Sequence, residues 1–65
     1  MMIAKLVQRI REEFDEAPGL AVTVDEGARF WALEPDTCRH VLAELQSMNV
    51  LVRTEDGRYR RAHSA

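Results

Sequence analysis

The apolar residues of the N-terminal segment recur at the spacing of a helix. Within residues 2–17 they follow the i, i+3, i+4, i+7 spacing and form one stripe: Ile3, Leu6, Val7, Ile10, Phe14 and Ala17. Polar residues fill the other positions, so the segment predicts an amphipathic helix with one buried face. Pro18 and Gly19 end this helix, because proline lacks a backbone donor and glycine accepts a left-handed turn.

A second helix is predicted over residues 24–32, after a short β-prone piece at residues 20–22. Thr23 and Glu26 stand three residues apart, which is the spacing of a capping box at the start of a helix. The helix has these apolar positions at or near it: Val24, Ala28, Phe30, Trp31 and Leu33. We expect Phe30 and Trp31 to lie in the core.

A third helix is predicted to begin near Pro35, a residue suited to the first helical position. Its expected buried stripe consists of Cys38, Val41, Leu42, Leu45 and Met48. Asn49 is a candidate for a left-handed C-terminal cap. The small Ala28 and Gly27 allow the second and third helices to cross at close range. We therefore expect a shared interior made by these side chains: Ala28, Leu33, Cys38 and Val41.

The C-terminal residues predict a β-hairpin. Residues 50–53 form one strand and residues 58–62 the other, with Tyr59 facing the core. The two strands are joined by a Thr-Glu-Asp-Gly turn, whose Asp-Gly pair is a strong hairpin signal. Residues 63–65 are expected to be a frayed tail. The whole chain, residues 1–65, is one domain of the α+β class, mainly α: a three-helix core with a C-terminal β-hairpin.

This order of elements resembles the winged helix-turn-helix family, and the resemblance covers residues 3–62. The segments that carry it are T-V-D-E-G-A-R-F-W-A-L, P-D-T-C-R-H-V-L-A-E-L and V-L-V-R-T-E-D-G-R-Y. Small bacterial regulators share this pattern. The resemblance implies that the third helix enters the DNA major groove and that the hairpin is the wing. Ala32 stands where the family usually has glycine, so we expect a helical backbone at this residue.

The resemblance also implies where DNA would be contacted. Arg39 could hold a guanine edge with two hydrogen bonds, and Thr37 and His40 could contact phosphates or base edges. In the wing, strand alternation would place Arg58 and Arg60 on the face opposite Tyr59. The candidate DNA-binding residues are Thr37, Arg39, His40, Arg53, Arg58 and Arg60.

The charge distribution leaves a second interpretation open. The net charge is −2 and the pI is about 5.6, whereas DNA-binding domains usually carry a basic surface. Asp36 and Glu44 stand beside Arg39 on the third helix and would oppose phosphates. Only residues 53–65 are locally basic. The function predicted first is therefore a small DNA-binding transcriptional regulator or accessory factor. The alternative is an acidic winged-helix module for protein–protein interaction or dimerisation.

Other classes of function find no support in the sequence. There is no glycine-rich phosphate loop and no nucleophile with a nearby base, so we expect neither an enzyme nor a small-molecule substrate or cofactor. Cys38 and His40 do not have metal-ligand spacing, so no metal is expected. No apolar run approaches the length of a membrane span.

The expected setting is the bacterial cytoplasm. Cys38 is the only cysteine, which excludes an internal disulfide and favours a reducing compartment. All but one of the nine basic residues are arginine, as in GC-rich bacterial genomes. The thin core of so short a chain favours a homodimer, which we expect to form through the first helix, extended by Met1 and Met2.

Overall fold

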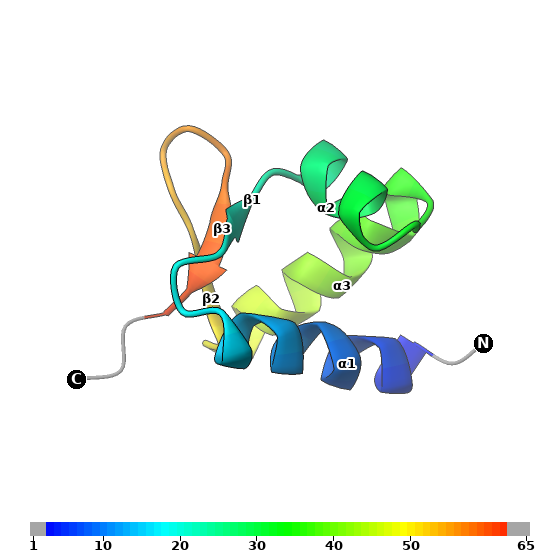
Figure 1. Ribbon diagram of the computed structural model, residues 1–65, viewed down its shortest axis with the longest axis horizontal. Coiled ribbons are helices and arrows are strands. Elements are labelled where there is room, and N and C mark those ends of the chain that lie inside the picture. The colour runs from blue at the N-terminus through cyan, green and yellow to red at the C-terminus, as the bar shows by residue number, and fades with distance from the viewer. Residues whose placement is uncertain (1–2, 63–65) are drawn as a thin grey trace.

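The computed structural model describes residues 3–62 as three helices and a small antiparallel sheet (Figure 1). The elements in chain order are α1 (Ile3–Glu16), β1 (Ala21–Val22), α2 (Val24–Phe30), α3 (Pro35–Ser47), β2 (Leu51–Arg53) and β3 (Tyr59–Arg61). The predicted fold class is confirmed: the protein is α+β and mainly helical, with a three-helix core and a C-terminal hairpin in a winged-helix-like layout. The predicted tail, residues 63–65, lies outside the described residues.

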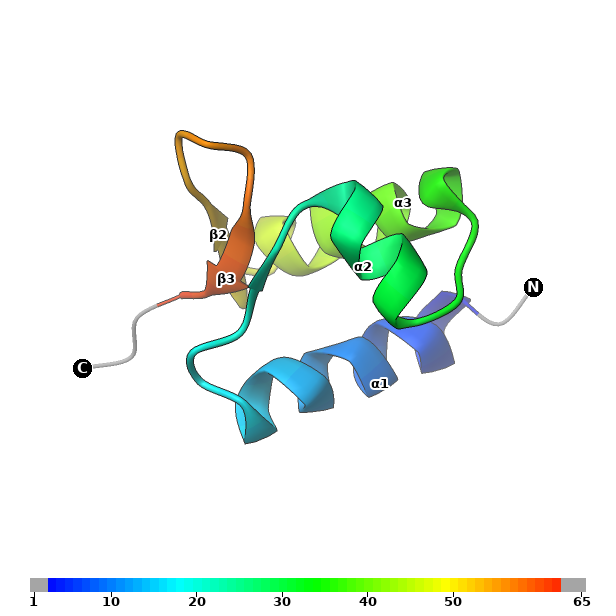
Figure 2. The ribbon, with the colours of Figure 1, turned by 45° about the horizontal axis from the view of Figure 1, so that its top comes forward.

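The core lies where the three helices meet the sheet. Its buried side chains come from every element: Ile10, Phe14, Val22, Ala28, Cys38, Val41, Leu42, Leu45, Leu51 and Tyr59. The expected convergence is confirmed, because Ala28, Cys38 and Val41 are buried together and the partly buried Leu33 packs against them. Figure 2 shows α2 and α3 lying together across one side of α1.

Three residues predicted to be buried are exposed instead: the small Ala17, just past the end of α1, and two large side chains. Phe30 is 63% exposed and Met48 is 48% exposed. Phe30 lies two positions from Ala28, about 200° around the helix, so α2 turns its side chain away from the core. Met48 is the C-cap residue of α3 and lies beside a groove between α3 and α1. The predictions that Phe30 and Met48 are buried were wrong because of where these two side chains lie. The helices themselves form as predicted.

The short piece before α2 joins the hairpin as a third strand, giving the strand order β1-β3-β2. Val22 pairs with Tyr59, and both side chains face the core. On the opposite face of the sheet, Arg60 pairs with Ala21 on one side and with the exposed Val52 on the other. The predicted placement of Arg60 opposite Tyr59 is therefore confirmed, and the sheet presents Arg60 to solvent, whereas Arg58, predicted on the same face, precedes β3.

The turn between α2 and α3 has a left-handed residue. Ala32 has φ = 55°, its N–H donates to the Arg29 carbonyl at 3.4 Å, and the Leu33 N–H donates to the Ala28 carbonyl at 2.8 Å. These two hydrogen bonds form a Schellman motif, whose left-handed position usually holds glycine. The expectation of a helical backbone at Ala32 was wrong. The end of α3 repeats the motif with Asn49 at φ = 64°, which confirms the predicted cap.

Ala32→Gly is expected to raise the free energy of unfolding by about 1 kcal/mol, because the left-handed backbone crowds the Cβ of alanine and spares glycine. The measurement is urea denaturation at neutral pH. The control is Ala43→Gly at an exposed position inside α3, which should lower the free energy of unfolding by about 1 kcal/mol. Destabilisation by both substitutions would contradict the left-handed geometry at Ala32.

Candidate nucleic-acid interface

Helix α3 is anchored by one face and leaves the opposite face uncovered. Cys38, Val41, Leu42 and Leu45 are buried, and the side chains that point outward are exposed: Asp36, Arg39, His40, Ala43, Glu44 and Ser47. The orientation follows from the apolar spacing of the helix and from its contacts with both α1 and α2. The uncovered residues make up what we term the outer face of α3.

Charges on the outer face largely offset one another. Arg39 Nη1 lies 2.7 Å from Asp36 Oδ1, one turn away on the same helix. Both side chains remain open to solvent, so the pair contributes little to stability. His40 is exposed beside them. Thr37 is half-buried in a shallow recess that it shares with Ile3, so it is less accessible than its sequence position suggests.

The wing consists of β2, β3 and the turn between them. Gly57 has φ = 84°, which the Asp-Gly turn requires, and the Thr54 N–H donates to the Arg58 carbonyl at 2.8 Å. Thr54 also holds Asp56 by a hydrogen bond, which lowers the pKa of the Asp56 carboxyl. Arg53 and Arg60 are exposed on the wing, and within residues 3–62 neither makes an ion pair. They are the accessible cations of this region.

Arg58 has structural partners instead. Its Nη1 lies 2.7 Å from Glu26 Oε1 on α2 and 3.5 Å from the Ala21 carbonyl, and its Nε lies 3.4 Å from Asp56 Oδ2. The guanidinium therefore ties the wing to β1 and to the start of α2. Its role in DNA binding stays a prediction, in which a phosphate would have to compete with two carboxylates for this side chain.

The Glu26 side chain takes part in the N-terminal cap of α2 and also forms an ion pair with Arg58 of the wing. The Thr23 N–H donates to Glu26 Oε1 at 3.0 Å, and the Glu26 N–H donates to Thr23 Oγ1 at 3.1 Å, which completes the predicted capping box. The hydrogen bond from the Thr23 backbone, helped by the charge of Arg58, lowers the pKa of the Glu26 carboxyl. The sequence identified the cap but gave no sign of the contact between Glu26 and Arg58, which lies 32 positions away.

The lowered pKa of Glu26 predicts that the free energy of unfolding depends on pH. A carboxyl with a lower pKa in the folded than in the unfolded state stabilises the fold above its unfolded pKa, and this contribution is lost as the pH falls through the folded pKa. Glu26→Gln should therefore be less stable than the wild type at neutral pH, and the difference should shrink toward about pH 3. Denaturant titrations at both pH values would measure it. Glu12→Gln makes the same change on the exposed side of α1, at a side chain without a hydrogen bond or ion pair among residues 3–62, and serves as the matched control.

Two further features concern reactive and metal-binding side chains: the thiol of Cys38 and the grouping of metal-ligating residues. Burial raises the pKa of the Cys38 thiol, with Asp25 adding to the effect, so the thiol stays protonated in the core. Across residues 3–62, no three His, Cys, Asp or Glu side chains are grouped so that they could hold a metal ion. None of the helices in the same range is long and apolar enough to cross a membrane.

Comparison with known proteins gives no relative: no protein-family model, no curated protein and no solved structure matches the chain.

Proposed function

We propose that the protein binds double-stranded DNA as a small winged helix-turn-helix protein, in the role of a transcriptional regulator or accessory factor. In this proposal α3 enters the major groove and the wing contacts the phosphate backbone. The observation that carries the proposal is an exposed outer face of α3 on the same domain as two exposed wing arginines, Arg53 and Arg60, which make no ion pair within residues 3–62.

The two surfaces would contribute differently. Arginine side chains on the wing would supply affinity that is independent of sequence, because each phosphate contact releases condensed counterions. Arg39 and His40 on α3 would supply contacts to base edges. Arg39 first has to leave Asp36, which costs little because the pair is solvent-exposed. The −2 net charge predicts modest affinity that depends strongly on salt.

The proposal predicts a change in the salt dependence of DNA binding. For the Arg53→Ala/Arg60→Ala double variant, the slope of log K against log salt should become shallower by about 2, because each lost phosphate contact removes about 0.9. The measurement is fluorescence anisotropy with a labelled duplex between about 50 and 200 mM salt.

The matched control is Lys5→Ala/Arg9→Ala, which removes the same charge from the exposed side of α1. It should leave the slope nearly unchanged. If the wild type fails to bind duplex DNA at the lowest salt, or if both double variants lose affinity equally, the proposal is wrong.

One observation favours a second candidate, a protein-interaction or dimerisation module that does not bind DNA. Helix α3 carries Asp36 and Glu44 against Arg39, so its outer face is slightly negative where DNA would approach. Under this candidate the duplex titration shows no binding at any salt, while light scattering or capture of a partner still detects association. The same pair of measurements therefore separates the two functions.

A further inference from the structure

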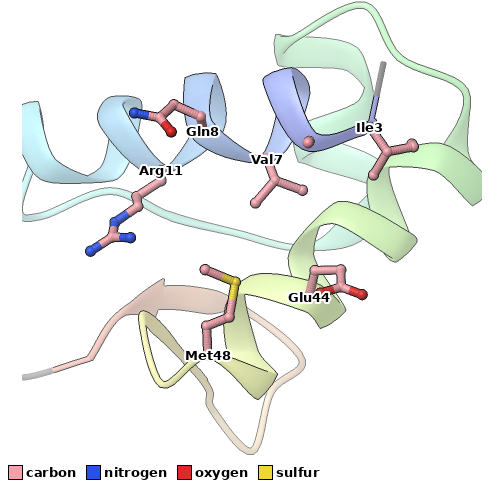
Figure 3. Close-up of a pocket in the computed structure, with 7 residues that line it drawn as sticks. Ile3, Val7, Gln8, Arg11, Glu44 and Met48 are labelled. Atoms are coloured by element: carbon pink, nitrogen blue, oxygen red, sulfur yellow. The ribbon is translucent and has the colours of Figure 1, made fainter. Parts of the chain in front are cut away.

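An apolar groove runs between α1 and the C-terminal half of α3; it lies apart from the wing and shares Glu44 with the outer face of α3. It has a volume of about 370 Å³ and is lined by Ile3, Ala4, Val7, Gln8, Arg11, Glu44 and Met48 (Figure 3). Met48 is 48% exposed, and Val7 and Ile3 are only partly covered by the fold. Exposed thioether and aliphatic groups gathered in one recess indicate a surface for association.

Opposite charges stand at the two sides of this groove. Figure 3 shows Arg11 of α1 and Glu44 of α3 on opposite sides of Met48. Among the ion pairs of residues 3–62, which involve Arg39, Arg58 and Arg61, neither Arg11 nor Glu44 takes part. Both side chains are exposed, so both charges are available to a partner.

We propose that the occupant of this groove is a second copy of the same chain, docked about a two-fold axis that passes near Met48. In such a contact the same patch faces itself, so every residue pair occurs twice. The axis brings Arg11 of each copy to Glu44 of the other. The Met48 side chains meet at the centre, where their flexibility lets them fill the gap between two identical surfaces.

The positions of Arg11 and Glu44 favour a second copy of the chain as the occupant of the groove. A groove with one positive and one negative side is complementary to itself after a rotation of 180°, whereas an unrelated partner would need its own opposite charges in the matching order. The domain also gains from self-association, because a chain of 65 residues buries a small core. The proposal does not depend on DNA binding: it shares Glu44 with the outer face of α3 but uses neither Arg39 nor the wing.

The groove has seven lining residues, whereas a standard interface uses about 20–30 residues on each side, so the expected dimer is weak. A standard interface buries about 800 Å² of each partner, roughly a sixth of the 4569 Å² that the chain exposes. We expect a dissociation constant of about 1–100 μM and weaker association at high salt. The sequence predicted a dimer through the first helix; the groove adds the C-terminal half of α3, while Met1 and Met2 lie outside the described residues.

Two charge reversals test the pairing across the axis. Arg11→Glu leaves the groove with two acidic groups and Glu44→Arg leaves it with two basic groups, so each variant alone should dimerise at least about tenfold more weakly than the wild type. An equimolar mixture of the two variants should associate again, because both cross-axis contacts then join opposite charges. Sedimentation equilibrium at low salt measures all three samples.

Controls and a second variant complete the experiment. Arg9→Glu and Glu16→Arg make the same charge changes elsewhere on α1 and should leave dimerisation unchanged. Met48→Lys places like charges at the axis and should weaken the dimer without unfolding the chain, as circular dichroism would verify. Three outcomes overturn the proposal: a wild type that stays monomeric at about 1 mM, a dimer that neither reversal weakens, or a mixture that associates no better than its components. Each can occur whether or not the protein binds DNA.

Discussion

Phe14→Ala is expected to remove about 3–5 kcal/mol from the free energy of unfolding. Phe14 is fully buried, and its ring centroid lies 5.8 Å from that of Trp31, so it joins α1 to the end of α2. Truncation would open a cavity at the centre of the core. At about 0.05–0.15 kcal/mol per residue, a chain of this length has only about 3–10 kcal/mol of stability. A large part of the population should therefore unfold.

The other phenylalanine provides the matched control. Phe30 is exposed and touches Trp31 edge-on, with centroids 5.5 Å apart, so Phe30→Ala should cost less than about 1 kcal/mol. Urea denaturation followed by circular dichroism would measure both variants. Equal losses from the two substitutions would contradict the placement of Phe14 inside the core and Phe30 outside it.

The helical core could be predicted because its evidence is local and periodic. The stripe through Ile10 and Phe14 defines one buried face of α1, and the spacing of Cys38, Val41 and Leu45 defines that of α3. Thr23 and Glu26 locate the start of α2 to the residue. The Asp-Gly turn likewise located the hairpin, although the strands are shorter than the apolar pattern suggests.

Burial at the ends of elements was harder to predict. Hydrophobicity alone suggested that Phe30 and Met48 are buried, but a residue at the end of a helix is covered only if another element reaches that far. Nothing in the local pattern shows how far α1 extends alongside α3. Ala32 presents a related difficulty: its left-handed backbone follows from where α2 ends, and alanine itself gives no signal for such a conformation.

Some features of the candidate site could likewise be predicted from the sequence, and others could not. The outer face of α3 follows from its periodicity, so Arg39 and His40 could be placed on it from the sequence. The pairing of Arg58 with Glu26 could not, because it joins residues that only the folded chain brings together. The groove of Arg11, Glu44 and Met48 is also a tertiary feature, made by two helices far apart in the sequence.

Substitution of Gly27 should disrupt the crossing of α2 and α3, which holds the outer face of α3 in place. A Cβ at Gly27 would lie 2.8 Å from the Trp31 ring and 3.1 Å from Cys38 Sγ. Gly27→Ala gains about 1 kcal/mol of helix propensity, but overpacking of the core costs about 1–3 kcal/mol. We expect a net loss of about 1 kcal/mol. Gly27→Val adds two more methyl groups and should cost about 3 kcal/mol or more.

A double-mutant cycle identifies the cause of that loss. Trp31→Leu removes the ring atoms that a Cβ at Gly27 would meet, and it removes an indole Nε1 that is buried without a hydrogen-bond partner among residues 3–62. In the Trp31→Leu background, Gly27→Ala should therefore be nearly neutral, with a coupling of about 1 kcal/mol between the two positions. Denaturation of the wild type, both single variants and the double variant would measure this coupling. An unchanged cost in the two backgrounds would mean that the Trp31 ring is not the reason for glycine, whereas a full rescue shows that Gly27 makes room for the Trp31 ring at the end of the same helix.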